Sequence, residues 1–352
     1  MTSIEILATG RIDERDSAFP QSVQLPNGDV LCSFSVGGGQ YVHGGTDWYR
    51  SKDRGVTWTL EGTLLPATEN PPSANFLKLS MSADRRIIYA YGTRYHGSTS
   101  DKFGQRRGEA ILCRSLDGGH TWTAPEVLPM PDMGLEISHS LRPLASGRLL
   151  APAATLERQD RLGEEVFVLI SDDGGKTWPH RRTVLRDPDG QLGFWEQKLT
   201  EVAPNQVLAV AWTVTLGEYQ DRKNSFSWSH DGGWTWQPFR STGIQGQTMT
   251  PLVLDDQRML VLYNRRYGEQ GIVAALVRYT FESWEVLSES LLYDARARRD
   301  RPAAATGVDE LDSFQFGFPT SIRLDDGTIL ATHWCVERDV CGVRWTKFAL
   351  RG

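Results

Sequence analysis

The amino-acid sequence predicts an all-β protein: a six-bladed β-propeller that spans residues 1–352 as a single domain. Three observations lead to this prediction. An octapeptide with the pattern S-x-D-x-G-x-T-W occurs four times, a pattern typical of apolar β-hairpins occurs six times, and no stretch shows sustained helical periodicity.

The octapeptide starts recur at intervals of 64, 56 and 58 residues, which suits a four-stranded blade with long loops. Its Asp and Ser side chains can bond backbone N–H groups within a turn, its Gly can adopt a positive φ, and its Trp can fill the gap between neighbouring sheets. We therefore expect each copy to fasten the turn between two strands, and its aspartate to be structural rather than catalytic. The copies are Ser51–Trp58, Ser115–Trp122, Ser171–Trp178 and Ser229–Trp236.

Each blade is expected to begin with two apolar strands around a tight turn such as Asn-Gly, Ser-Gly or Asp-Gly. Only one further strand follows the last hairpin, so blade six lacks its outer strand. We expect Ile4–Ala8 to supply that strand, which would close the ring and remove an exposed sheet edge. The six hairpins are Ser22–Phe34, Leu77–Tyr91, Leu141–Ala153, Leu199–Trp212, Pro251–Tyr263 and Ser321–Trp334.

Composition narrows the range of partners. There are 38 Lys and Arg against 44 Asp and Glu, a net charge of −6, so the broad positive field that nucleic acids and anionic membranes require is missing. The N-terminus carries no signal-peptide pattern and the chain no long apolar run, so we expect a cytoplasmic protein without a membrane partner. The four cysteines are expected to be free and buried, and no histidine or carboxylate spacing predicts a metal or a cofactor.

In this arrangement the octapeptides resemble the Asp boxes, or BNR repeats, of the sialidase (neuraminidase) superfamily, and the resemblance covers essentially the whole chain. Ser138–Leu141 followed by Gly147–Ala153 is similar to the family's third-blade segment. Trp195–Val202 resembles the fourth-blade stretch whose glutamate activates a tyrosine nucleophile, and the match assigns that role to Glu196.

The chain departs from the sialidase pattern at the positions of the substrate-binding arginines and of the catalytic tyrosine. Ala18-Phe19-Pro20 stands in place of the family's Arg-Ile-Pro, a second arginine is missing near Trp212-Thr213, and Phe318 replaces the tyrosine nucleophile. A sialidase needs its carboxylate clamp and its nucleophile together. We therefore expect a substrate other than sialic acid.

An internal alignment leads to the same glutamate without the family. Counting nine residues back from each hairpin turn gives one carboxylate among six positions expected to lie at the axis: Phe19, Phe76, Ser138, Glu196, Thr248 and Phe318. A lone buried carboxylate is costly unless it is paired, for example with Lys198, or used in catalysis. We expect Glu196 to be catalytic, with Asp47 as its partner and His139 as a further catalytic residue.

The loops that join second to third strands should open on the face where the sugar would bind. Flat aromatic rings stack on sugar C–H surfaces, and Arg forks hold carboxylates or hydroxyls. The expected substrate-binding residues are His43, Arg94, Tyr95, His96, Lys198, Tyr263, Arg265, Arg266 and His333.

These features predict a glycoside hydrolase that acts from the chain end on a small saccharide. Two alternatives remain open. A uronate lyase could draw its proton-transfer and cationic groups from His43, Arg94, Tyr95, His96 and His139. A carbohydrate-binding propeller without turnover would fit a channel filled by Phe19, Phe76 and Phe318.

Overall fold

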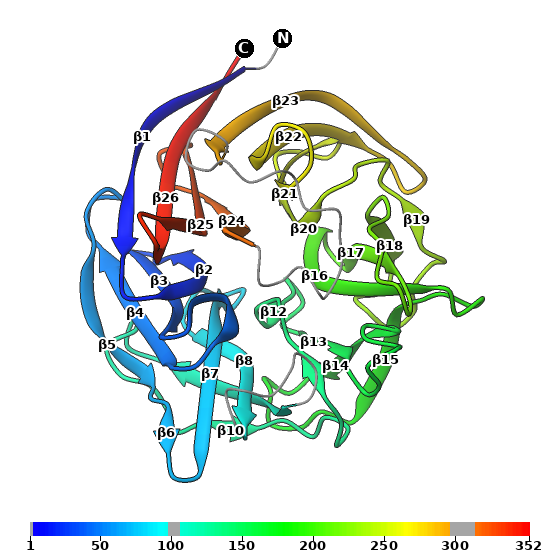
Figure 1. Ribbon diagram of the computed structural model, residues 1–352, viewed down its shortest axis with the longest axis horizontal. Coiled ribbons are helices and arrows are strands. Elements are labelled where there is room, and N and C mark those ends of the chain that lie inside the picture. Colours follow the sequence, from blue (N-terminus) through cyan, green and yellow to red (C-terminus); the bar gives the residue numbers. More distant parts are fainter. Residues whose placement is uncertain (1–2, 98–105, 296–313) are drawn as a thin grey trace.

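Six antiparallel sheets surround one axis in the computed structural model, which describes residues 3–97, 106–295 and 314–352 (Figure 1). This arrangement confirms the six-bladed propeller. Within each sheet, antiparallel strands follow one another outward from the axis.

The strands are assigned to blades as follows. Blade one contains β2 (Ser17–Gln24), β3 (Val30–Val36), β4 (Gly45–Ser51) and β5 (Thr59–Leu65), with the short 3₁₀ helix η1 (Gly39–Tyr41) between β3 and β4. Blade two contains β6 (Thr68–Glu69), β7 (Pro72–Met81), β8 (Ile88–His96), β9 (Arg107–Ser115) and β10 (Glu126–Val127). Blade three contains β11 (Leu135–Glu136), β12 (Arg142–Pro143), β13 (Leu149–Thr155), β14 (Glu165–Ser171) and β15 (His180–Arg186).

The second half of the ring follows the same order. Blade four contains β16 (Leu192–Ala203), β17 (Gln206–Thr215), β18 (Ser225–Ser229) and β19 (Arg240–Ser241). Blade five contains β20 (Gln247–Val253), β21 (Arg258–Arg265), β22 (Gly271–Tyr279) and β23 (Trp284–Asp294). Blade six contains β24 (Phe316–Arg323), β25 (Ile329–Glu337), β26 (Val340–Arg351) and, from the other end of the chain, β1 (Ser3–Asp13).

The N-terminal strand closes the ring as predicted. β1 pairs antiparallel with β26, and the register runs from Ser3 opposite Arg351 to Asp13 opposite Val343 (Figure 1). The strand is longer than the expected Ile4–Ala8, because its pairing with β26 begins at Ser3 and continues past Ala8 to Asp13. Closure within one blade couples the two ends of the chain and covers the long edge of β26.

The repeated octapeptide forms the turn that its residues predict. In the third copy the carboxylate of Asp173 accepts bonds from the Lys176 and Thr177 amides, both over 3.0 Å, and from the Thr177 hydroxyl over 2.7 Å. Ser171 donates to the same carboxylate and accepts from the Gly175 amide. These bonds hold the pKa of Asp173 well below its usual range. The side chain is therefore committed to the turn.

A repeated irregularity marks the inner strands. Phe19, Glu196, Thr248 and Phe318 adopt φ values of 61°, 47°, 41° and 53°, each where the inner strand shifts register against the second strand. All four belong to the set that the nine-residue count placed at the axis, so that equivalence is confirmed in four blades. A bulge of this kind bends the strand and redirects a side chain, and bulges are common beside functional sites.

All four cysteines are free and buried, as expected. Cys335 lies opposite Gly342 and Cys341 opposite Val336, so the two thiols project from opposite faces of the sheet and cannot pair. The described ranges contain no helix of the length and hydrophobicity needed to cross a membrane.

Candidate active site at the propeller axis

Two glutamates from neighbouring blades meet at the axis. The backbone amide of Glu196, on the bulge of β16, donates to both carboxylate oxygens of Glu136, over 3.0 and 3.1 Å. Glu136 lies on β11 and also accepts a bond from the Ser138 hydroxyl. Glu136 is buried, whereas Glu196 is partly exposed. The sequence prediction named only Glu196, because Glu136 lies two residues before the aligned position Ser138.

Two buried lysines flank the carboxyl groups. Lys198, two residues after Glu196 on β16, donates to the Ser138 carbonyl and has its Nζ 3.7 Å from the Phe318 ring centre. Lys78, on β7, donates to the Ile137 carbonyl over 2.5 Å. Its Nζ lies 3.3 Å from the Phe76 ring centre. Backbone carbonyls, aromatic faces and nearby carboxylates together compensate for removing two ammonium groups from water.

Three phenylalanines form the opposite half of the axis. The Phe19 ring centre lies 5.3 Å from that of Phe76 and 5.2 Å from that of Phe318, and only Phe19 is partly exposed. Tyr95 stacks on Phe76 with ring centres 6.1 Å apart. Blades six, one and two therefore present an apolar aromatic surface, while blades three and four present the carboxyl groups.

Burial raises the pKa of both glutamates, and the bonds that Glu136 accepts distinguish the two. Desolvation raises the pKa of Glu196 to about 7, with a further rise from Glu136, against the opposing charges of Lys198 and Arg266. Desolvation also raises the pKa of Glu136, but its bonds from Ser138 and from the Glu196 amide stabilise its charged form. The site can therefore hold a proton on Glu196 near neutral pH, while the bonds that Glu136 accepts favour its charged form.

Four of the other residues predicted for the site lie near this centre. Lys198 and Tyr95 belong to it directly, and Arg266 exerts its charge on Glu196. Burial lowers the pKa of Lys198 to about 8 and raises that of Tyr95 to about 12. His139 is buried, and its Nδ1 accepts a bond from the Leu199 amide over 3.1 Å. Burial and Lys198 hold the pKa of His139 well below its usual range, so the imidazole is a neutral bridge between blades three and four.

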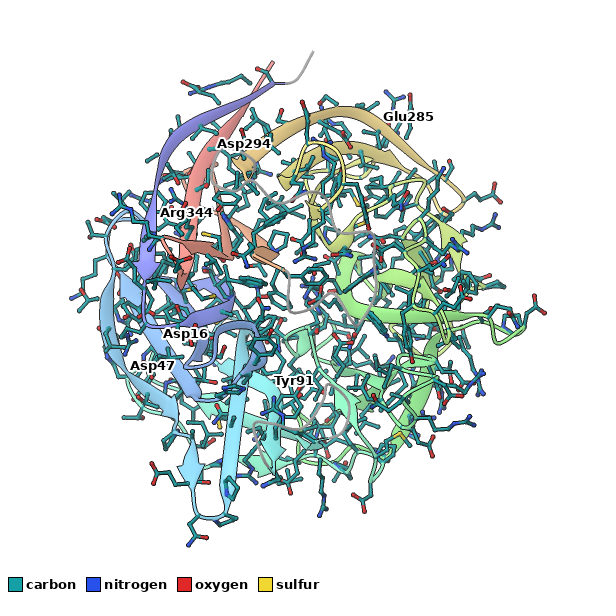
Figure 2. The ribbon with its side chains drawn as sticks, viewed as in Figure 1. Asp16, Asp47, Tyr91, Glu285, Asp294 and Arg344 are labelled. Carbon is teal, nitrogen blue, oxygen red and sulfur yellow. The ribbon has the colours of Figure 1, made fainter. Side chains whose placement is uncertain are left out.

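Asp47 does not take the place expected for the second carboxylate. Its oxygens accept bonds from Arg15, in the segment between β1 and β2, over 2.8 Å and from Thr63 on β5 over 2.7 Å, away from the axis (Figure 2). Side chains alternate along β4, and the preceding Thr46 is the one that reaches the next blade, where its hydroxyl donates to Asn75. Glu136 provides the second carboxyl group at the axis instead.

The remaining predicted residues are engaged elsewhere. Arg94 and His96 both contact Glu109, over 2.7 and 2.9 Å. His43 is exposed and stacks on Tyr41.

Tyr263 and Arg265 both bind Glu289 on β23, the outermost strand of blade five. His333 packs against Tyr293 on the same strand, with ring centres 4.8 Å apart. Tyr263 and Arg265 therefore face the outer part of the ring, and His333 packs between blades five and six.

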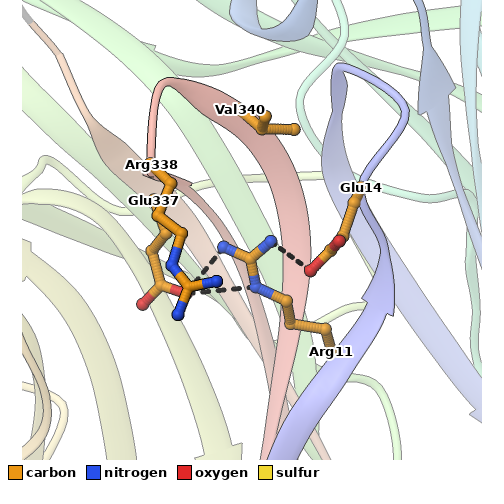
Figure 3. Close-up of a pocket in the computed structure, with 5 residues that line it drawn as sticks. All are labelled: Arg11, Glu14, Glu337, Arg338 and Val340. Carbon is orange, nitrogen blue, oxygen red and sulfur yellow. Dashed lines mark hydrogen bonds and ion pairs between the residues drawn. The ribbon is translucent and has the colours of Figure 1, made fainter.

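A separate surface pocket of about 330 Å³ lies where β1 closes blade six (Figure 3). Its lining residues are Arg11, Glu14, Glu337, Arg338 and Val340. Arg11 pairs with both Glu14 and Glu337, so the polar lining is largely an ion-pair network. The Arg11–Glu337 pair connects β1 to β25. This pocket contains none of the residues predicted for the site.

Comparison with known proteins identifies relatives of the fold. A family profile described as "BNR repeat-like domain" matches residues 95–330. A protein of unknown function from Dyadobacter fermentans DSM 18053 is 22% identical with a TM-score of 0.76, over 99% of both chains. The NanB sialidase from Streptococcus pneumoniae is 13% identical with a TM-score of 0.66, over 98% of this chain and 70% of that one.

An alpha-L-arabinanase from Penicillium chrysogenum, solved with arabinobiose, is 16% identical with a TM-score of 0.67, over 97% of this chain and 98% of that one. At these identities the likeness to solved structures establishes a shared fold and leaves the chemistry to be argued from the site.

Proposed function

This chain belongs to the family of BNR repeat-like domains, and from that premise we propose that it is a glycoside hydrolase that releases a terminal sugar, other than sialic acid, from a small saccharide. The observation that carries the proposal is the Glu136–Glu196 pair at the axis. Glycoside hydrolysis requires one carboxyl group that keeps a proton and a second that is ionised. The bonds from the Glu196 amide hold Glu136 next to Glu196 at the axis.

Glu196 acts as the general acid in this proposal. Its pKa of about 7 lets the carboxyl group keep a proton near neutral pH and transfer it to the glycosidic oxygen as the bond from that oxygen to the anomeric carbon breaks. Glu136 remains ionised and faces the positive charge that develops on the sugar. Water completes the reaction, either activated by Glu136 or after a covalent intermediate with it, and the anomeric configuration of the product distinguishes the two.

Two further features support an exo-acting enzyme for a sugar other than sialic acid. Phe19, Phe76 and Phe318 pack against one another at the axis, which favours a site closed at one end. Ala18 and Phe318 also occupy positions where the sialidase pattern has an arginine and the tyrosine nucleophile. The names of two similar structures, a sialidase and an arabinanase, agree with the general class.

The test is a screen of the wild-type protein against aryl glycosides and small oligosaccharides, repeated with Glu196→Gln. Glu201→Gln is the matched control: Glu201 lies on the same strand and uses its carboxylate to bind the Ala145 and Asn205 amides over 2.7 and 2.9 Å. We expect a reducing sugar product from the wild type and from Glu201→Gln, and a release from oligosaccharides that is lower on the order of 10²–10⁴-fold in Glu196→Gln. Equal turnover by Glu196→Gln would contradict the proposal. An unsaturated product that absorbs in the near ultraviolet would indicate a uronate lyase instead, and binding without product a carbohydrate-binding propeller.

A further inference from the structure

We propose that Asp221 is a positioning residue for this site: acting through Gln247, it fixes the guanidinium of Arg266 near Glu196. Its effect on turnover rests on the proposed function, whereas its effect on Glu196 itself does not. Asp221 lies in the segment after β17, outside every pattern that the sequence analysis identified.

Asp221 is a buried carboxylate with an unusual number of side-chain donors. It receives the Trp212 indole N–H over 2.6 Å, the Gln247 amide N–H over 2.8 Å and the hydroxyl of Tyr267. The donors come from blade four, the start of blade five and the loop after β21. Three donors on one buried carboxylate favour its charged form and hold these segments in one arrangement.

The link to Arg266 depends on the orientation of the Gln247 side-chain amide. Gln247 donates through its Nε2 to Asp221 and accepts through its Oε1 from Arg266. An ionised carboxylate only accepts and a guanidinium only donates, so the amide fits between them in one orientation. Arg266 also donates to the Phe316 carbonyl, and its Cζ lies 3.6 Å from the Phe314 ring centre.

A second path leads from Asp221 to the other side of Glu196. Trp212, held by Asp221, packs edge-on against Trp195 with ring centres 4.9 Å apart. The Trp195 indole donates to the Leu162 carbonyl over 2.7 Å, and Trp195 directly precedes Glu196 on β16. Asp221 therefore supports both Arg266 and the backbone that carries Glu196.

The test reverses the direction of the hydrogen bond between residues 221 and 247. The double variant does so without changing the total charge of the pair. In Asp221→Asn the new amide can satisfy Trp212 or Gln247 but not both, and a flipped Gln247 would turn its NH₂ group toward Arg266. Gln247→Glu alone places two carboxylates in contact. The double variant Asp221→Asn/Gln247→Glu restores an acceptor at position 247 for Arg266 and places a donor at position 221 for the new carboxylate. We therefore expect it to recover the wild-type behaviour that each single variant loses.

The direct readout is the titration of the Glu196 carboxyl group by ¹³C NMR, with the signal assigned by its loss in Glu196→Gln. The charged groups that face Glu196 are Lys198, Glu136, Arg266 and Lys78. Because Arg266 lowers the pKa of Glu196, displacing it in Asp221→Asn should raise that pKa, and the double variant should return it. In turnover we expect a loss of about tenfold or more in kcat/KM for Asp221→Asn, carried mainly by kcat, and recovery in the double variant.

Glu289→Gln is the matched control. Glu289 also binds a tyrosine hydroxyl in blade five, that of Tyr263 over 2.6 Å, but it is not part of the hydrogen bonds that link Asp221 to Arg266. An unchanged Glu196 titration in folded Asp221→Asn, or a double variant as impaired as the single ones, would overturn the proposal. If Asp221→Asn does not fold, the double variant decides: recovery of the fold and of the Glu196 titration supports the proposal, and failure to fold overturns it. The titration needs no substrate, so it is independent of whether the protein is a glycosidase.

Discussion

The backbone amide of Glu196 donates to both carboxylate oxygens of Glu136, over 3.0 and 3.1 Å. The positive φ of Glu196, 47°, belongs to a bulge that interrupts the pairing of β16 with β17 at this residue. An amide that pairing would have engaged is thereby available to a carboxylate from the neighbouring blade. The bulge thus connects the strand geometry directly to the arrangement of the two carboxyl groups.

Replacing Glu136 should change both turnover and the acidity of Glu196. Glu136→Gln keeps an oxygen acceptor for the Glu196 amide but removes the negative charge, so the pKa of Glu196 should fall from about 7 toward its usual value. Turnover should fall on the order of 10²–10⁴-fold, the usual contribution of a general acid or base. The pH–rate profile and the ¹³C titration of Glu196 measure these effects. An alkaline limb that stays in place would show that Glu136 does not act on Glu196.

Lys198 should have the opposite influence. Lys198→Met removes the positive charge that most strongly lowers the pKa of Glu196, so this pKa, and with it the alkaline limb of the activity profile, should rise above about 7. Lys347→Met is a suitable control, because Lys347 pairs with Asp326 and takes no part at the axis. A downward movement of the limb in Lys198→Met would contradict this assignment of charges.

The raised pKa of Glu196 also predicts how stability depends on pH. A carboxyl group whose folded pKa is about 7 binds its proton more tightly in the folded state than in the unfolded state, where the pKa is near 4.5. The associated stability is present below pH 4.5 and is lost as the pH rises through 7. Glu196→Gln removes this dependence, so its stability relative to the wild type should increase between pH 5 and 8, on the order of 2 kcal/mol. Urea unfolding at both pH values checks this, and a difference that is constant or decreases with pH would argue against a raised pKa.

The aspartate of the octapeptide should matter for stability alone. Asp173→Ala removes the acceptor of the Lys176 and Thr177 amides and of the Thr177 hydroxyl, so the free energy of unfolding should decrease. Turnover per folded molecule should remain at the wild-type level. Lost turnover with unchanged stability would mean that this turn takes part in the chemistry.

The fold could be predicted because its signals are local and repeated. Each octapeptide and each hairpin turn specifies one corner of a blade, and six hairpins then determine the number of blades. The nine-residue count also located Phe19, Glu196, Thr248 and Phe318 at equivalent bulges, because the hairpin register carries that information along the inner strand.

The partners of Glu196 could not be predicted in the same way. The inner segment of blade three is interrupted into β11 and β12, and Glu136 lies before the hairpin on which the count was based. Its spacing of two residues from Ser138, which places both side chains on one face of an extended segment, is the signal that could have identified it. Asp47 and Tyr263 were assigned to the site because of the loops next to them. Side chains alternate along β4 and β21, however, and these two contact Arg15 and Glu289 instead. Only the packed structure determines which face of these strands meets the axis.

The measurement that tests the central claim most directly compares two leaving groups in Glu196→Gln. A general acid is needed when the leaving oxygen is a sugar alkoxide, and hardly needed when it is a dinitrophenolate, which departs without a proton. We predict that kcat/KM falls on the order of 10²–10⁴-fold for the natural disaccharide linkage and by less than about tenfold for the 2,4-dinitrophenyl glycoside of the same sugar. An equal loss on both substrates, or no loss on either, would contradict the assignment of Glu196 as the proton donor of this site.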